Sequence, residues 1–101
     1  MRLVQIFLPL YDNNGRRFPA RMYAQERKRL IARFGGLTAY ARAPAHGLWK
    51  DGARTKRDDI VILEVMTRKV DGKWWNAYRH QLQKRFKQKE LLVRAQDVKV
   101  L

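Results

Sequence analysis

The chain has no cysteine, and among its 101 residues there are only three prolines and two histidines. Without cysteine it can form no disulfide, no thiolate nucleophile and no cysteine-ligated metal site. The two histidines, His46 and His80, are far apart in the sequence. We therefore expect no metal site and no cofactor. No stretch approaches the ~20 consecutive apolar residues that span a bilayer, so we also expect a cytoplasmic protein with no membrane span.

Acidic residues are scarce as well: nine Asp and Glu stand against 23 Lys and Arg, which gives a net charge of +14. A field of this size attracts nucleic acid, anionic lipid or acidic proteins, and it also keeps a small protein in solution. The basic residues are spread along the chain rather than gathered in one run. Solvated helix faces explain most of them, and a nucleic-acid surface is the alternative. The candidates for nucleic-acid contact are Lys50, Arg54, Lys56, Arg57, Lys84, Arg85 and Lys87.

With 46% hydrophobic residues the chain can form one modest core, so we expect a single domain over residues 1–101. Apolar residues at helical spacing indicate helices, and the pair Gly35-Gly36 is typical of a helix end. Strict alternation over 37–43 and a nearly continuous apolar run over 60–67 both predict strands. The expected elements are a strand at 3–10, a turn at 12–15, a helix at 19–34, strands at 37–43 and 60–67, a helix at 74–90 and a strand at 92–100.

The order β-α-β-β-α-β predicts an α+β protein with a ferredoxin-like fold. In this topology the first and third strands are central, and these are the two most apolar strands of the chain. Right-handed crossovers place both helices on one face of the four-stranded antiparallel sheet. The other face of the sheet is then open.

Strand alternation assigns residues to this open face. Val61, Leu63 and Val65 form a purely apolar set that suits the helix-covered side, so their neighbours face the other way. The open face is expected to carry Gln5, Phe7, Thr38, Tyr40, Arg42, Ile60, Ile62, Glu64, Met66, Arg94 and Gln96. A face of such mixed character is a contact surface in many proteins, and a homodimer with face-to-face sheets is the expected solution.

Glu64 is a lone carboxylate in an apolar strand, and two interpretations of it stay open. It is either a structural group paired with Arg42 or Arg94, or a binding or acid–base group in an apolar pocket. The pocket candidates beside the connection 44–59 are Tyr40, Arg42, His46, Trp49 and Glu64. A small enzyme with Glu64 or His46 as proton carrier is a further alternative. An anion in the third strand disfavours base stacking in the manner of RNA-recognition domains.

Three short segments carry a resemblance. Phe34-Gly35-Gly36-Leu37-Thr38-Ala39-Tyr40, Gly47-Leu48-Trp49 and Asp59-Ile60-Val61-Ile62 form a "GG-x-T … G-x-W … strand" pattern. The chain resembles a family of small bacterial proteins with this pattern over roughly residues 4–67. The resemblance implies a ferredoxin-like fold and no established activity, so it transfers no catalytic residue.

Overall fold

The computed structural model describes residues 1–42 and 59–101. Its elements are β1 (Arg2–Pro9), α1 (Ala20–Phe34), β2 (Thr38–Arg42), β3 (Ile60–Thr67), α2 (Gly72–Arg85) and β4 (Val93–Asp97). The strands form one sheet in the order β2-β3-β1-β4, and every neighbouring pair is antiparallel. The chain therefore has the α+β, ferredoxin-like fold that its sequence predicts. Among the described residues, no helix is long and apolar enough to cross a membrane.

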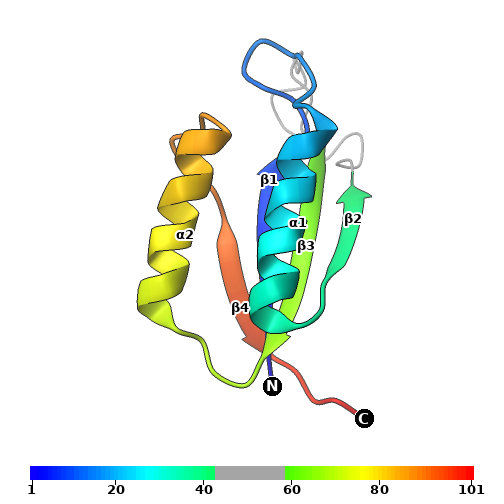
Figure 1. Cartoon of the computed structure of the whole chain (residues 1–101), viewed down its shortest axis with the longest axis vertical. Coiled ribbons are helices and arrows are strands. Elements are labelled where there is room, and N and C mark those ends of the chain that lie inside the picture. The colour runs from blue at the N-terminus through cyan, green and yellow to red at the C-terminus, as the bar shows by residue number, and fades with distance from the viewer. Residues whose placement is uncertain (43–58) are drawn as a thin grey trace, which may run out of the picture.

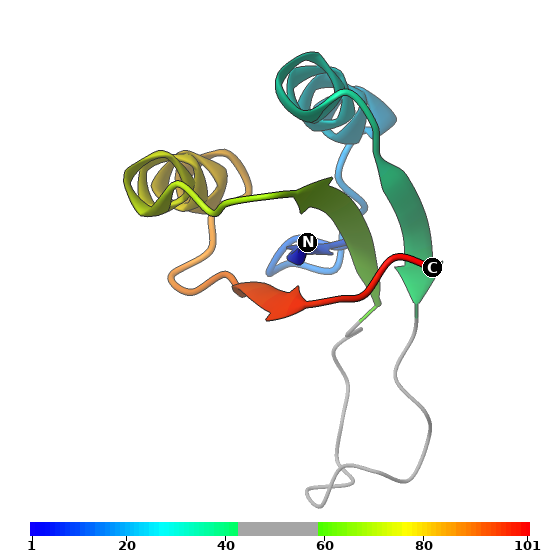
Figure 2. The same ribbon diagram turned by 90° about the horizontal axis from the view of Figure 1, so that it is seen from below.

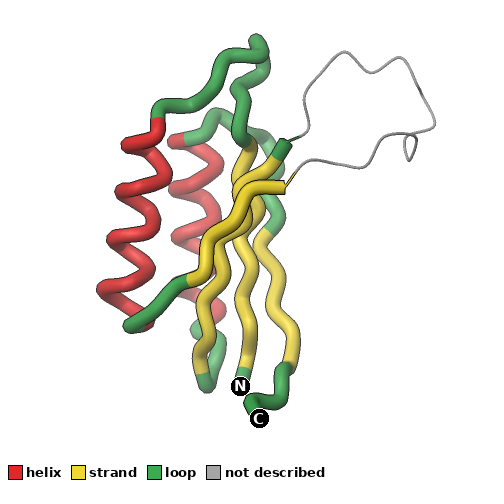
Figure 3. Tube along the Cα trace, turned by 90° about the vertical axis from the view of Figure 1, so that its right-hand side faces the viewer, coloured by secondary structure: helices red, strands yellow, loops and turns green. Residues whose placement is uncertain are grey.

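The molecule has two layers. Both helices lie on one side of the sheet and run side by side, while the other side of the sheet carries no helix (Figures 1 and 3). The view from below shows the same separation, with α1 and α2 above the curved sheet (Figure 2). This arrangement follows from the two right-handed crossovers. It leaves two distinct surfaces: the open face of the sheet and the outer side of the helix pair.

The core lies between the two layers and depends on alternation along the central strands. Val4, Ile6 and Leu8 of β1 are at most 1% exposed and point toward the helices. Leu63 and Val65 of β3 join them, as expected from the sequence. The helices complete the core with Tyr23, Leu30, Trp75, Tyr78 and Leu82, and the connections add Phe18, Phe86 and Leu91.

The second helix is shorter than the pattern of apolar residues predicts. It begins at Gly72, because Asp71 caps it by accepting a hydrogen bond from the Trp74 backbone N–H at 3.2 Å. It ends at Arg85 rather than at residue 90, and Lys87 has a positive φ of 52°. Phe86 is fully buried against the Phe18 ring, whose centroid is 5.1 Å away, so the chain turns into the core there. The last strand is likewise shorter than the expected 92–100.

Gly35 ends α1 in the left-handed conformation, with φ 82°, and its N–H donates to the carbonyl of Ile31 at 2.8 Å. This confirms the helix end predicted from the glycine pair. Only the first glycine of the pair needs its conformational freedom, because Gly36 has no positive φ. A Cβ at either position would meet no atom within 4 Å. The two sites therefore differ in backbone conformation and not in available space.

We predict that Gly35→Ala lowers the free energy of unfolding by about 1 kcal/mol, because an L side chain is strained at this φ. Gly36→Ala is the matched control and should leave stability unchanged or raise it by up to about 1 kcal/mol, since it restricts the unfolded chain. Urea unfolding followed by circular dichroism measures both. Equal effects of the two substitutions would contradict the role assigned to Gly35.

Candidate functional site on the open face of the sheet

One row of residues crosses the open face from edge to edge. In the strand register, Thr38 of β2 lies opposite Glu64 of β3, Glu64 opposite Gln5 of β1, and Gln5 opposite Arg94 of β4. Because opposite residues in antiparallel strands point to the same face, these side chains share the uncovered side of the sheet. A polar row thus runs across all four strands.

Hydrogen bonds link this row into a network. Gln5 Nε2 donates to Glu64 Oε2 at 2.6 Å, and Arg94 Nε donates to Gln5 Oε1 at 2.9 Å. The Tyr40 hydroxyl, from the next row, donates to the same Glu64 Oε2 at 3.0 Å. Glu64 Oε1 accepts no hydrogen bond from the described residues. The carboxylate is therefore held in place by one oxygen while the other remains able to accept.

Apolar groups flank the network on both sides. Ile62 is only 1% exposed although it lies on the open face opposite Tyr40, and Phe7 is paired with it in register. The Arg94 guanidinium lies over the Phe7 ring, 4.9 Å from its centroid, a cation–π contact. On the other side of the row Met66 is 47% exposed. Glu64 thus sits in a largely apolar surface, half-buried.

The open-face assignments from the sequence agree with the register, but of the two expected partners of Glu64, Arg94 does not pair with it directly. Gln5 lies between Glu64 and Arg94, so no direct ion pair forms between them and the Gln5 amide bridges the two charged groups. Arg42 lies opposite Ile60 at the end of β2, on the same face. Its side chain, His46, Trp49 and the rest of 43–58 lie outside the described residues. The same holds for the basic candidates Lys50, Arg54, Lys56 and Arg57.

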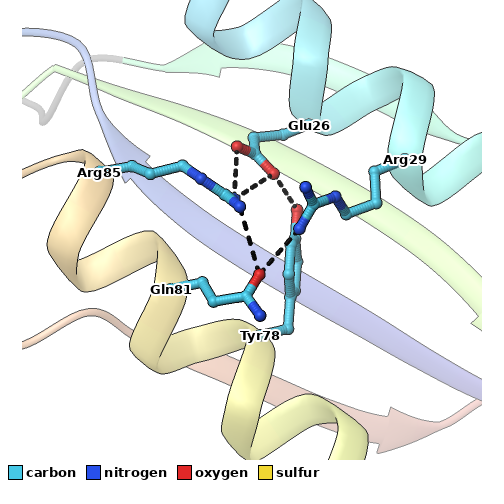
Figure 4. A network of polar contacts seen from close by, with 5 residues as sticks. All are labelled: Glu26, Arg29, Tyr78, Gln81 and Arg85. Atoms are coloured by element: carbon cyan, nitrogen blue, oxygen red, sulfur yellow. Dashed lines mark hydrogen bonds and ion pairs between the residues drawn. The ribbon is translucent and has the colours of Figure 1, made fainter.

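A second polar cluster lies between the helices and was not anticipated. Glu26 of α1 is 2% exposed, and its carboxylate accepts hydrogen bonds from the Tyr78 hydroxyl at 2.9 Å and from Arg85 Nη1 at 2.9 and 3.2 Å (Figure 4). Gln81 Oε1 accepts from both Arg29 Nη1, at 2.8 Å, and Arg85 Nη2, at 3.3 Å. The helices are therefore joined by charge-assisted bonds above the core.

The sequence held a signal for this cluster. The buried positions of α1 are Tyr23, Glu26 and Leu30, so a carboxylate occupies a place in the apolar stripe at helical spacing. A buried carboxylate needs a partner, and Arg85 fills that role. Arg85 is thus largely engaged within the protein, whereas Lys84 and Lys87, proposed with it as nucleic-acid contacts, are exposed near the end of α2. No group of three or more acidic or histidine side chains in the described part of the chain could hold a metal ion.

Comparisons with known proteins bear on the fold. No protein-family model matches this chain, and no curated protein sequence does. Among solved structures, a phage SAM lyase in complex with S-methyl-5'-thioadenosine is similar, with a TM-score of 0.65 and 14% sequence identity over 95% of this chain and 80% of that one. A phage SAM lyase in the apo state gives a TM-score of 0.61 at 13% identity, over 94% of this chain and 78% of that one. At this identity the likeness establishes a shared fold.

Two tyrosines in the helical layer should ionise late. Burial, reinforced by the Glu26 carboxylate, raises the pKa of Tyr78 far above its usual value, and burial raises the pKa of Tyr23 to about 12 although Arg17 opposes it. In the unfolded chain tyrosine ionises near pH ~10. Between pH ~10 and ~12 the unfolded state therefore loses protons that the native state keeps, so the free energy of unfolding falls as pH rises through this window.

We predict that absorbance near 295 nm shows two of the four tyrosines ionising only above pH ~12 or together with unfolding. Tyr78→Phe should remove one late tyrosine and make stability less dependent on pH above ~10. Tyr40→Phe serves as the control, because it leaves Tyr23 and Tyr78 in place. Four tyrosines that all titrate near pH ~10 in the native protein would contradict the burial of this pair.

Proposed function

We propose that this protein is a homodimer that binds a small ligand at Glu64 on the open face of its sheet. The observation that carries the proposal is the state of the Glu64 carboxylate. Tyr40 and Gln5 fix one oxygen, and the other accepts nothing from the described residues. A carboxylate fixed in an apolar surface with a vacant acceptor is suited to receive a hydroxyl or a cationic group from a ligand.

A nucleoside is the ligand class that we propose. Carboxylates in nucleotide-binding proteins accept hydrogen bonds from ribose hydroxyls, and the partly exposed Phe7 beside the polar row can contact a base. The similarity to a phage SAM lyase, solved with S-methyl-5'-thioadenosine, supports this choice of ligand class. The pocket candidates His46 and Trp49 lie outside the described residues and stay predictions.

The proposed dimer interface is the same open face of the sheet. Tyr40 and Met66, which are 40% and 47% exposed, join Phe7 and Ile62 on a side of the sheet that no helix covers. Covering such a mixed surface with a second copy of itself gives an isologous interface in which every residue is used twice. Sheets stacked face to face lie ~10 Å apart, a distance that the side chains of the two faces fill.

Calorimetric titration with S-methyl-5'-thioadenosine tests the ligand site. We expect measurable binding by the wild type, and a loss of about tenfold or more in Glu64→Gln, because the amide replaces an ionised acceptor. Glu26→Gln is the control: it makes the same change in a buried carboxylate between the helices. Absence of binding at millimolar ligand, or equal losses in both variants, would overturn the proposed site.

The same samples address the second candidate, an enzyme with Glu64 or His46 as proton carrier. The structural neighbours are named as SAM lyases, which is the reason to test this alternative. Protein is incubated with SAM and the products are separated by chromatography. Turnover that Glu64→Gln abolishes would assign the chain to this alternative, and tight binding of S-methyl-5'-thioadenosine without turnover supports the binding protein.

Sedimentation equilibrium tests the dimer. We expect a dimer at micromolar concentration, dissociated by Met66→Glu, since that substitution places a charge in the proposed interface. Ile31→Glu is the matched control, because Ile31 of α1 is 49% exposed on the helical layer and Met66 is 47% exposed on the sheet. A monomeric wild type refutes the dimer, and a trimer or larger assembly refutes the two-fold interface.

A further inference from the structure

The outer side of the helix pair carries a groove that the proposed function does not use. Two adjoining hollows of about 430 and 480 Å³ lie between α1 and α2, and both are lined by Arg29 and Ala32. Because they share these walls, they adjoin each other, and together they are called the groove below. Ala32 and Ala77 are small residues on its two sides, which explains why the helices leave a hollow here.

The groove is strongly basic. Lys28, Arg29, Arg33 and Arg85 line it, and Glu26 is the one carboxylate among the lining residues. That carboxylate is buried and already neutralised by Arg85 at 2.9 Å. Since a buried ion pair has no charge to spare, it does not offset the other cations. The lining therefore presents positive charge to solvent from both helices.

The remaining cations differ in how far they are compensated. Arg33 Nη2 lies 3.7 Å from Asp71 Oδ2, a loose ion pair between half-exposed side chains. Lys28 and Arg29 are exposed and make no ion pair within the described part of the chain. These two neighbouring residues are the uncompensated charges of the groove.

The geometry of Arg29 and Arg85 favours an anion. Both guanidiniums donate to a single neutral oxygen, Gln81 Oε1, and because Glu26 balances the charge of Arg85, the charge of Arg29 is the one left unbalanced (Figure 4). Each guanidinium has five N–H donors in a planar fork, and most of those of Arg29 are unused here. A phosphate accepts bidentate hydrogen bonds from such a fork and balances the charge of Arg29.

The length of the groove and the charge of the chain point to a polymer. On α1 the lining residues run from Gln25 to Arg33, which is about 12 Å at ~1.5 Å per residue. A nucleic-acid strand in a duplex presents a phosphate every ~3.4 Å of its axis, so several phosphates fit along this length. The net charge of +14 supplies the long-range attraction.

The aromatic residues of the groove, Trp74 and the buried Tyr78, do not offer an open stacking platform for bases. The Trp74 ring is covered by the Arg33 guanidinium, 4.2 Å from the ring centroid, and stacks on Tyr78 with centroids 4.9 Å apart. Recognition of single-stranded bases depends on open aromatic faces. The groove is therefore suited to the backbone and not to the bases.

We propose that the groove between α1 and α2 binds the phosphodiester backbone of nucleic acid without sequence preference, with Lys28 and Arg29 as the principal contacts. The proposal rests on different residues from the ligand site at Glu64 and is independent of it. It also differs from the sequence-based expectation, in which Lys84 and Lys87 were among the contacts.

Fluorescence anisotropy with labelled oligonucleotides, single-stranded and duplex, tests the groove between 50 and 200 mM salt. We expect binding that weakens steeply with salt. The double variant Lys28→Gln/Arg29→Gln should bind about tenfold more weakly, and its slope against log salt on single strands should be shallower by about 1.4, because two phosphate contacts are lost. Two oligonucleotides of unrelated sequence should bind alike.

Lys84→Gln/Lys87→Gln is the matched control, since it removes the same charge from exposed positions outside the groove lining. Thermal unfolding establishes that both double variants are folded. Equal weakening in the two variants, or no binding by the wild type at 50 mM salt, would contradict nucleic-acid binding in the groove. Full displacement by millimolar pyrophosphate would indicate a site for small phosphates, and competition by polyglutamate equal to that of an oligonucleotide would indicate a general polyanion surface. Either outcome overturns the assignment to nucleic acid.

Discussion

The architecture depends on the two-sided use of β1. This strand pairs with β3 on one side and with β4 on the other, so its backbone is committed along its length. Its even-numbered residues Val4, Ile6 and Leu8 form the centre of the core, while Gln5 and Phe7 face the open side. Shifting its register by one residue would exchange these sets, burying Gln5 in the core. The core and the polar row across the sheet are therefore two consequences of one alternation.

The helical layer is held by a different kind of interaction. Glu26 is an acid at a core position, and an unpaired buried carboxylate would destabilise the protein strongly. Tyr78 and Arg85, about two turns apart on α2, supply its hydrogen bonds and charge. They hold the two helices in a fixed relation and bring Arg85 beside Arg29 at Gln81. The contacts that compensate the buried Glu26 carboxylate thus also determine where Arg85 and Arg29 lie in the groove.

Much of the fold could be predicted from the sequence, because the spacing of apolar residues shows which side of an element is buried. That spacing is every second residue in a strand and every three or four residues in a helix. The row containing Glu64 followed from strand parity. The hydrogen bonds of this row could not be predicted in the same way. Strand parity gives the face on which a residue lies, but it does not show that Gln5 lies between the Glu64 carboxylate and the Arg94 guanidinium. The end of α2 was missed because Phe86 continues the apolar spacing while its side chain turns into the core. The groove was missed because it depends on which basic side chains meet across two helices, and sequence spacing within one helix carries no such information.

The distribution of charge explains how one small domain can present two chemically different surfaces. α1 contributes five basic residues and α2 four, against Glu26 alone, so the helical layer carries much of the net charge. On the sheet face, the described side chains include one carboxylate, Glu64, and one guanidinium, Arg94, joined through Gln5. At physiological salt the Debye length is ~8 Å, so charges that the two surfaces present to solvent at greater separations are largely screened from each other. Salt therefore acts on the two surfaces in opposite directions: it weakens phosphate binding in the groove and lowers the repulsion between copies that approach through their sheets.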